Sequence, residues 1–526
     1  MHSVRYLMST AAVSVLAGAT VALLAMPASA DNVLGLKVLK EVHHDTSLPL
    51  RDMIRSYDQQ HHGNQSGPHE INPVRPIPYD KSTERPDGVK GESMAPGAVP
   101  TTDLANFEGI DVLCGCAPPD TNGAVGATQF VQWVNLQFAI YNKTTGALIS
   151  GPTNGNALWT GFSGRCAGSN SGDPIAQYDK VAGRWVMMQP VFSAPYKICV
   201  AVSTTSDATG TYNRYEFDMG SVKFPDYPKL GVWPASGNPG YFLTVNNFTN
   251  NFVGAMLCGM DRTNMLAGSS ATMQCFQLSS SFGGVLPGDF DGTTLPPAGE
   301  DEDFVNFTGG NTANFWKMHA DFANPVNTTL VGPVAVTVPA FTRAQGVPQK
   351  NTTTRLDTLS DRMMYRLAYR NLGDHEAFVT NHSVNVNARA AVRWYEFRNP
   401  SAPTLFQSGN IKHKTLHYWM GSVAMDKNGD IAGGFNTSSA NDFPGITYAG
   451  RTPGLAAGKM QKHAGGLTTN GTGSQTSGLT RWGDYSAMSV DPADDCTFYY
   501  TTEYLKVTGS FNWNTRVNSF KFNTCS

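Results

Sequence analysis

The chain has 526 residues, including 53 Gly and 31 Pro, and only 15% of its residues are charged. That composition suits short strands joined by many turns. The formal net charge of −3 excludes both a global basic field for nucleic acid and a polyanionic chain, so we expect no nucleic-acid partner. Any charge-based recognition must be local.

The first 30 residues have the pattern of an export signal. His2 and Arg5 precede an apolar run over about residues 11–26, and residues 28–30 (Ala-Ser-Ala) form a cleavage pattern. A membrane anchor is the alternative, but the run contains small residues, Ser and Thr, and no other stretch is apolar enough to cross a bilayer. We predict a signal peptide over residues 1–30, a secreted or periplasmic protein, and no membrane association after cleavage.

Residues 31–104 are polar and rich in Pro. They contain five of the twelve His residues, which are His43, His44, His61, His62 and His69. His-rich tracts can bind metal, but these lack the fixed spacing of a structural site and have no Cys nearby. We predict a disordered Pro/His-rich arm or pro-segment, in which residues 34–42 could form a short helix, and no metal site.

A hairpin pattern recurs from residue 120 onward. Its clearest copy spans residues 481–501, where Asp484 precedes an alternating apolar run, a turn with Asp and Pro, and a second run. The copies open at Asp120, Asp173, Asp226, Asp303, Asp361, Met420 or Gly421, and Asp484. An all-β unit of this size cannot bury its own faces, which indicates radial packing. We therefore predict an all-β, seven-bladed β-propeller over residues 105–526.

The last copy has one strand too few. After its hairpin only residues 515–522 can form another strand. Residues 107–112, just before the first copy, could supply the missing partner, because a strand from the other end of the chain covers the exposed edge and closes the ring. We also expect almost no long helix after residue 107.

The eight Cys residues favour disulfides, because their number is even, the chain is exported and no C-x-x-C pair occurs. Cys258 and Cys275 fall on neighbouring strands of one blade, and so do Cys496 and Cys525. These placements predict two disulfides directly. Elimination then pairs Cys166 with Cys199 and Cys114 with Cys116, and the last pair would close a strained ring.

The opening acids are the main candidates for a functional site. In a propeller, the innermost strand of each blade starts at one face, and the loop after the second strand returns to it. The acids should therefore ring the mouth of a central channel, beside the polar residues that end the second strands. The acids are Asp120, Asp173, Asp226, Asp361 and Asp484, joined by Asp303 as a weaker member, and the neighbouring residues are Asn135, Gln189, Asn246, His319, Asn381 and Asn436.

A structural explanation competes with this site, because Asp before a strand often caps a turn and repeated Asp can brace neighbouring blades. Crowded carboxylates repel one another unless Arg, a proton or a cation relieves them. Arg362, Arg366 and Arg481 are the nearby cations; we expect no cofactor, although bound calcium would serve the same purpose. His382 is the best catalytic histidine. Trp419 and Trp482 lie nearest the channel, where they either pack in the core or stack on a sugar ring.

The repeated hairpins with opening acids, and turns such as residues 422–430 (SVAMDKNGD), resemble secreted propellers of the sialidase-like, Asp-box type. The resemblance covers about residues 107–525 as architecture, and no blade reproduces the motif S-x-D-x-G-x-T-W. It implies a glycan-active propeller rather than a sialidase. No G-x-S-x-G, H-E-x-x-H or P-loop pattern occurs, which argues against serine hydrolases, zincins and nucleotide binding.

We predict an exported, monomeric, carbohydrate-active protein whose partner is a polysaccharide or glycan. The leading hypothesis is a glycoside hydrolase, in which a carboxylic acid and a carboxylate flank the scissile bond. The alternatives are a polysaccharide lyase on the same face and a lectin-like or adhesive module without turnover. Catalytic candidates are Asp173, Asp361 and Asp484, assisted by Arg362, Arg481 and His382. Substrate-binding candidates are Asp120, Asn135, Gln189, Asp226, Asn246, Asn381, Trp419, Asn436, Trp482 and Tyr485.

Overall fold

A computed structural model of the chain describes residues 33–60, 68–90 and 93–526. The predicted signal peptide over residues 1–30 lies outside these ranges. Within them the protein is all-β, as predicted, and its α-helices are α1 (Leu50–Gln60) and α2 (Arg262–Ala267). The 3-10 helices are η2 (Lys81–Thr83), η3 (Gly155–Trp159), η4 (Arg165–Gly168) and η5 (Pro325–Asn327). Of the described helices, none is long and apolar enough to cross a membrane.

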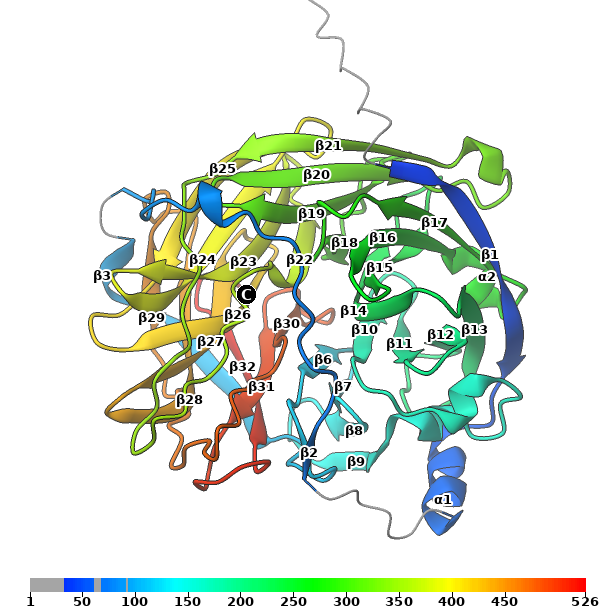
Figure 1. Ribbon diagram of the computed structural model, residues 1–526, viewed down its shortest axis with the longest axis horizontal. Coiled ribbons are helices and arrows are strands. Elements are labelled where there is room, and N and C mark those ends of the chain that lie inside the picture. The colour runs from blue at the N-terminus through cyan, green and yellow to red at the C-terminus, as the bar shows by residue number, and fades with distance from the viewer. Residues whose placement is uncertain (1–32, 61–67, 91–92) are drawn as a thin grey trace, which may run out of the picture.

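Curled sheets stand side by side around a common centre (Figure 1). One four-stranded sheet contains β6 (Thr121–Val125), β7 (Gln129–Val134), β8 (Gln137–Asn142) and β9 (Leu148–Asn154). The nine-stranded sheet consists of two four-stranded meanders with β1 (Val33–Thr46) between them. The first meander contains, in spatial order, β10 (Ile175–Asp179), β11 (Arg184–Val191), β12 (Tyr196–Ser203) and β13 (Tyr212–Gly220). Beyond β1 follow β17 (Thr272–Leu278), β16 (Phe252–Asp261), β15 (Gly240–Phe248) and β14 (Phe224–Trp233).

The remaining sheets follow around the centre. The eight-stranded sheet runs β21 (Thr329–Thr337), β20 (Thr312–His319), β19 (Glu302–Gly309), β18 (Leu286–Asp291), β22 (Met364–Asn371), β23 (Glu376–Val386), β24 (Arg389–Arg398) and β25 (Thr404–Ile411). The five-stranded sheet contains β26 (His417–Met425), β27 (Ile431–Ser439), β28 (Asp442–Arg451), β29 (Met460–His463) and β3 (Met94–Val99). The last four-stranded sheet contains β30 (Ala487–Val490), β31 (Phe498–Tyr504), β32 (Asn514–Phe522) and β4 (Thr101–Glu108), and a small parallel pair joins β2 (His69–Glu70) to β5 (Cys116–Ala117).

The prediction of a disordered arm over residues 31–104 is wrong for its described part. Strand β1 pairs with β13 on one side and β17 on the other, and so joins two meanders into one sheet. The short helix considered for residues 34–42 is therefore a strand. The physical reason is that β13 and β17 offer open edges far along the chain, which local composition cannot reveal. His44 stacks on Tyr215 with ring centroids 5.8 Å apart, so this histidine packs against the sheet.

An N-terminal strand does pair with the last strand of the chain, as predicted, but it begins earlier. Strand β4 spans Thr101–Glu108 and pairs antiparallel with β32, with Phe107 opposite Val517. The predicted segment, residues 107–112, contributes only the end of this strand and two further backbone bonds, from Gly109 to Thr515 and from Val112 to Trp513. The sequence predicts a strand that begins at Phe107, whereas the pairing with β32 already begins at Thr101.

The predicted fourth copy of the hairpin begins one strand too late. Strands β19 and β20 are the second and third strands of their meander, and β18 is the first. Asp303 therefore lies on a second strand, where it pairs with Lys317 at 2.9 Å, and His319 ends a third strand, where it contacts Asp301 at 2.9 Å. Neither residue belongs to the ring of opening acids. The sequence of β18, with Gly and two Asp in six residues, hides its strand character.

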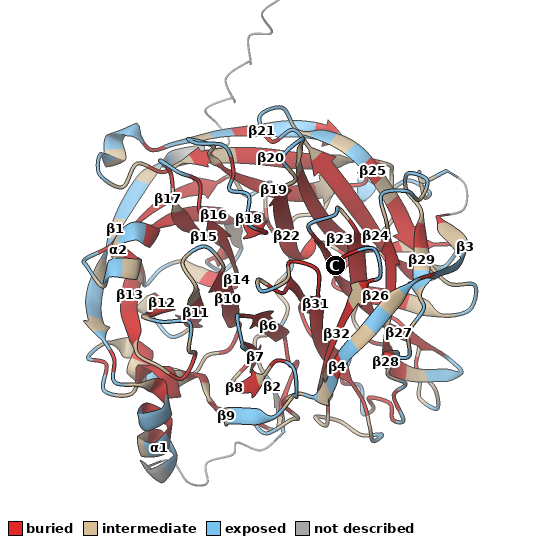
Figure 2. Cartoon of the chain, turned by 180° about the vertical axis from the view of Figure 1, so that it is seen from behind, coloured by how far each residue is buried: buried red, intermediate tan, exposed pale blue. Residues whose placement is uncertain are grey.

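The inner strands are buried on both faces, whereas outer strands such as β1, β4 and β9 carry exposed residues (Figure 2). Strand β12 is buried at seven consecutive positions, because neighbouring sheets cover both of its faces. All nine Trp side chains are fully buried. Trp419 and Trp482 pack against each other with ring centroids 5.7 Å apart, so the expectation that they stack on a sugar is wrong and the core alternative holds.

All four predicted disulfides are present: Cys114–Cys116, Cys166–Cys199, Cys258–Cys275 and Cys496–Cys525. Cys258 and Cys275 lie directly opposite each other on β16 and β17, as the strand placement predicts. The Cys496–Cys525 disulfide ties the start of β31 to the end of the chain.

Candidate functional site

The five predicted acids do come together at one end of the central region, where they form the mouth cluster: Asp120, Asp173, Asp226, Asp361 and Asp484 with Lys229, Arg362 and Arg481. Each acid lies at or just before the first strand of a meander, so the repeat itself places them. Arg481 pairs with Asp484 at 2.6 Å and Arg362 pairs with Asp361 at 2.8 Å. The predicted convergence of these residues is therefore observed.

Three acids of the mouth cluster, Asp120, Asp173 and Asp226, have raised pKa values. Burial, followed by the negative charges of Asp226 and Asp484, raises the pKa of Asp173 to about 7. Burial also raises the pKa of Asp226 to about 6, although Arg75 and Arg362 oppose the shift. The pKa of Asp120 lies well above its ordinary value for the same reasons. At neutral pH the cluster therefore contains both protonated and ionised carboxyl groups.

Lys229 lies in the middle of this cluster and is completely buried. Burial lowers the pKa of its ammonium group to about 7, against the opposing pull of Asp173 and Asp484. The Nζ atom lies 3.5 Å from the ring centroid of Tyr227 and 4.0 Å from that of Tyr485, and it donates to the backbone oxygen of Pro228 at 2.8 Å. A buried lysine of this kind can take up or release a proton near neutral pH.

A segment of the supposed arm crosses the mouth cluster. We call residues 69–80 the strap; Figure 1 shows it running from β2 across the centre of the molecule toward η2. Asn72 donates to Asp173 at 2.8 Å and accepts from Arg481 through its backbone oxygen at 2.8 Å. Arg75 lies 3.6 Å from Asp226 and 4.0 Å from the ring centroid of Phe224. The strap thus occupies polar groups that a ligand would otherwise contact.

Several predicted substrate-binding residues brace adjacent sheets. Asn135 accepts the backbone N–H of Asp173 at 3.1 Å, and Asn246 accepts that of Gly284 at 2.9 Å. Asp120 accepts the N–H of Asp484 at 2.7 Å. Other members make similar structural contacts: Gln189 donates to Ser169, Asn436 donates to Glu503 and accepts from Trp482, and Tyr485 donates to Pro174. These bonds support the structural explanation for those residues.

His382 lies apart from the mouth cluster, although Asn381 precedes it. Side chains alternate along β23, and His382 points into an aromatic group formed by Phe307, Phe341 and Tyr395. Burial, followed by the charge of Arg393, lowers its pKa well below the ordinary value, and its Nε2 atom lies 2.9 Å from the Tyr395 hydroxyl. Asn381 is fully buried, and its side-chain amide has no hydrogen-bond partner among the described residues.

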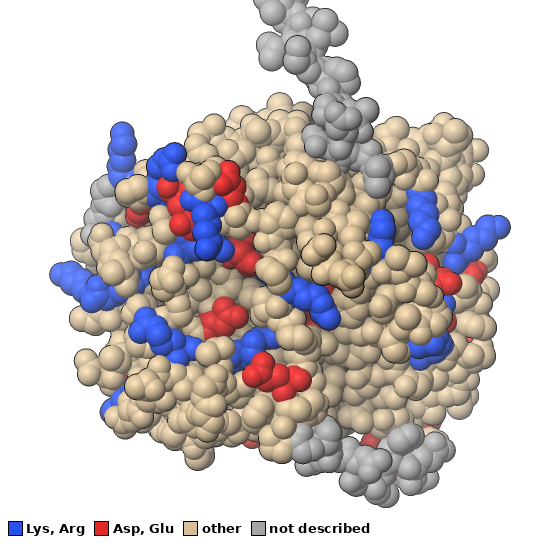
Figure 3. Space-filling view, viewed as in Figure 1, with Lys and Arg blue, Asp and Glu red and all other residues tan. Residues whose placement is uncertain are grey.

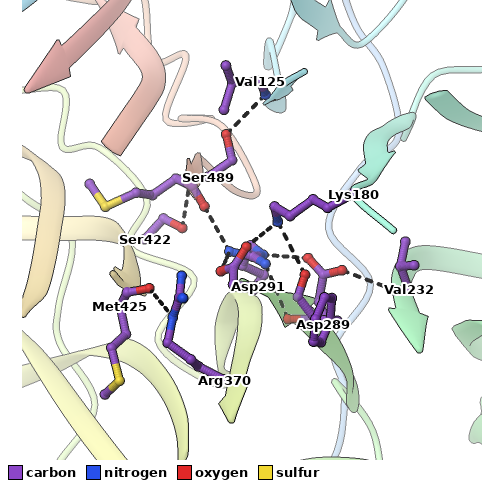
Figure 4. Close-up of polar contacts among 12 residues, drawn as sticks. Val125, Lys180, Val232, Asp289, Asp291, Arg370, Ser422, Met425 and Ser489 are labelled. Carbon is purple, nitrogen blue, oxygen red and sulfur yellow. Dashed lines mark hydrogen bonds and ion pairs between the residues drawn. The ribbon is translucent and has the colours of Figure 1, made fainter. Parts of the chain in front are cut away.

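A second polar group, the deep network, lies between the sheets (Figure 4). It consists of Lys180, Asp289, Asp291, Arg366, Arg370 and Asp495. Figure 4 labels four of its members, Lys180, Asp289, Asp291 and Arg370. Arg366 bridges the two carboxylates of β18, contacting Asp291 at 2.6 Å, and Lys180 also pairs with Asp291. Burial opposes ionisation of Asp291, but Arg366 and Lys180 hold its pKa well below the ordinary range. The deep network is therefore a set of matched charges contributed by strands and turns of several sheets.

Sequence reasoning missed several residues at the mouth. Lys229 gave a usable signal, because a lysine in the apolar run after Asp226 is unusual for a buried strand. Glu503, whose pKa burial raises to about 8, gave a similar signal at the end of β31. Asn72 and Arg75 gave none, because only the path of the chain brings the strap to the acids. Within the described ranges, no group of His, Cys, Asp and Glu could hold a metal ion.

No protein-family model and no curated protein sequence matches the chain. Two solved structures are weakly similar over most of its length. One is a protein of unknown function from Dyadobacter fermentans, with 8% identity and a TM-score of 0.25, covering 81% of this chain and 99% of that chain. The other is Drosophila Plexin A in complex with Semaphorin 1b, with 7% identity and a TM-score of 0.25, covering 82% and 89%. Neither similarity is close enough to assign a fold or a function to this chain.

Proposed function

We propose that the chain is a seven-bladed β-propeller closed by an N-terminal strand. Support comes from the order of the described strands, which fall into seven successive four-stranded units: β6–β9, β10–β13, β14–β17, β18–β21, β22–β25, β26–β29, and β30–β32 with β4. Strands β1, β2, β3 and β5 are additions to this plan. An experimental structure with six or eight such units would overturn it.

Within this fold we infer an exported, carbohydrate-active protein that works as a glycoside hydrolase at the mouth cluster. The observation that carries the proposal is the pair Asp173 and Asp226, two buried carboxyl groups with raised pKa values, in which the charge of Asp226 raises the proton affinity of Asp173. Glycoside hydrolysis needs one protonated carboxyl group as general acid and one carboxylate beside it. With a pKa of about 7, Asp173 fits the acid, and Asp226 fits the carboxylate. The sialidase-like resemblance supports a glycan as the substrate.

The surrounding residues suit this assignment. Arg481 and Arg362 each pair with an acid of the cluster, so negative charge near the pair is partly compensated. Asn72 and Arg75 of the strap contact Asp173 and Asp226. A sugar with hydroxyl groups would replace those contacts, which requires the strap to move aside. The four disulfides are consistent with an oxidising, extracellular location.

The test is turnover on a panel of polysaccharides, followed by reducing ends for hydrolysis and by unsaturated uronates for lyase chemistry. The Asp173→Asn variant should lose ~100-fold or more in turnover, the scale expected when a positioned acid is removed. The matched control is Asp374→Asn, because Asp374 is an exposed side chain in the turn at the opposite end of β22. Unaltered turnover by Asp173→Asn on a confirmed substrate would remove Asp173 from catalysis, and unsaturated products would replace the hydrolase with a lyase.

A further inference from the structure

A basic groove lies at the outer part of the molecule, and no residue of the strap is among those that line it. It has a volume of about 840 Å³ and lies between β3, the turn from β23 to β24, the connection from β25 to β26, and β29. Its cationic lining residues are Arg389, Lys412, Lys414 and Lys462. Figure 3 shows Lys and Arg side chains gathered over the side of the molecule where Figure 1 places β3 and β29.

The lining of this groove is positively charged, whereas the chain as a whole is negatively charged. The formal net charge is −3, yet none of the described residues that line the groove is Asp or Glu. Two nearby histidines respond to the positive field. Burial, followed by Lys462, lowers the pKa of His413, and Arg389 and Lys414 lower it further, whereas only Asp442 opposes them. Burial, followed by Arg355 and Arg389, lowers the pKa of His417 to about 4.

The geometry of the groove favours an extended ligand with several negative charges. The four cations come from three separate segments that border a groove of about 840 Å³, which has room for more than one small anion. Between the cations the floor is apolar, formed by Met94, Pro96 and Ala390 among others. A chain of sugar rings carrying carboxylates or sulfates matches both features, because its charges would meet the cations and its ring faces would cover the apolar floor.

We propose that this groove binds an acidic polysaccharide, that is, a chain of sugars with carboxylate or sulfate groups. Single-stranded nucleic acid is the other extended polyanion, but it is held in grooves by aromatic side chains on which bases stack. The described lining residues include no Phe, Tyr or Trp, so the composition favours the polysaccharide. Binding here needs no turnover and therefore goes beyond the function proposed for the mouth cluster.

The position of the groove adds to the argument. Asp361 precedes β22, and the antiparallel order of β22, β23, β24, β25 and β26 brings the β23–β24 turn and the β25–β26 connection back to the same end of the sheets as Asp361. The upper part of the groove therefore opens on the face that carries the mouth cluster. A long polysaccharide held in the groove could extend along that face.

The experiment measures binding to immobilised chondroitin sulfate and polygalacturonate at low ionic strength, with neutral dextran as the uncharged probe. The parent chain is compared with the Lys414→Glu/Lys462→Glu variant. Both replaced side chains are exposed, so the fold should tolerate the change. The control is Lys40→Glu/Lys81→Glu, which replaces two exposed lysines outside the groove and makes the same change in net charge, from −3 to −7.

We expect the parent and the control variant to bind the acidic polymers with similar affinity and to leave dextran unbound. The groove variant should bind at least ten-fold more weakly, a loss of about 1.4 kcal/mol, and binding by the parent should weaken as salt is added. Three results would overturn the proposal: no binding by the parent, equal loss in both variants, or displacement of the polysaccharide by a lower concentration of oligo-dT than of free polygalacturonate. Because the assay does not use turnover, its outcome is separate from that of the hydrolase test.

Discussion

The mouth cluster and the deep network are both buried groups of charged side chains at the centre of the molecule, but their charges are balanced differently. In the deep network each carboxylate faces a cation, and Arg366 alone contacts both Asp289 and Asp291. In the mouth cluster Asp120 and Asp173 accept backbone or amide hydrogen bonds but form no ion pair among the described residues. Matched charges stabilise ionised groups, whereas unmatched burial favours neutral ones. The first arrangement suits a scaffold and the second suits proton transfer.

The largest expected effect is on the deep network. The Arg366→Met variant would leave Asp289 and Asp291 buried without their main cation, which typically costs about 3–5 kcal/mol of stability. Denaturant unfolding at neutral pH measures the loss. The control is Lys506→Met, because the Lys506–Glu108 pair is exposed and should contribute less than about 1 kcal/mol. A loss no greater than that of the control would mean that the deep network is not a structural element.

Replacing Asp by Asn should affect stability differently in the deep network and in the mouth cluster. The pKa of Asp291 is lowered in the folded protein, so its contribution to stability is present above the unfolded pKa and is lost as the pH falls. The pKa of Asp173 is raised to about 7, so folding becomes less favourable as the pH rises from about 4 to 7. At pH 7.5 we therefore expect Asp291→Asn to lower the melting temperature and Asp173→Asn to leave it unchanged or raise it. Equal destabilisation by both would contradict the distinction.

Lys229 should give the mouth cluster a second pH dependence. Its folded pKa of about 7 lies below the unfolded value of 10.5, so the unfolded chain binds more protons between these values. Its contribution therefore makes stability rise as the pH increases from about 7 to 10. In the Lys229→Met variant this rise should be smaller. Unfolding curves at several pH values measure it, with the exposed Lys40→Met as the control; an identical slope in Lys229→Met and the parent would show that the buried ammonium does not titrate in this range.

The sequence was sufficient where a signal repeats or is local. The opening acids recur at each hairpin, so their convergence at Asp120, Asp173 and Asp484 could be predicted, and the strand assignments placed Cys258 opposite Cys275. The prediction for the fourth unit is wrong because β18 is rich in Gly and Asp and lacks the alternation of a strand, so the pattern points to β19 as the first strand. The roles of β1 and the strap could not be predicted, since their partners lie more than a hundred residues away along the chain. A solvated arm would have the same polar, Pro-rich composition as these two segments.

The smallest expected effect on stability, and the one that most directly links the strap to function, concerns Arg75. Its ion pair with Asp226 spans 3.6 Å and its side chain is one-third exposed, so Arg75→Ala should cost no more than about 1 kcal/mol. The same change removes a cation that a substrate must displace from Asp226. On a confirmed substrate we therefore expect a lower KM with little change in kcat, because the gain is in access and not in the chemical step. Arg85→Ala is the control, since Arg85 lies beyond the strap and its side chain donates to the backbone oxygens of Ser82 and Glu84. If Arg75→Ala leaves KM at the parent value, the strap does not compete with the substrate and is a structural crossing alone.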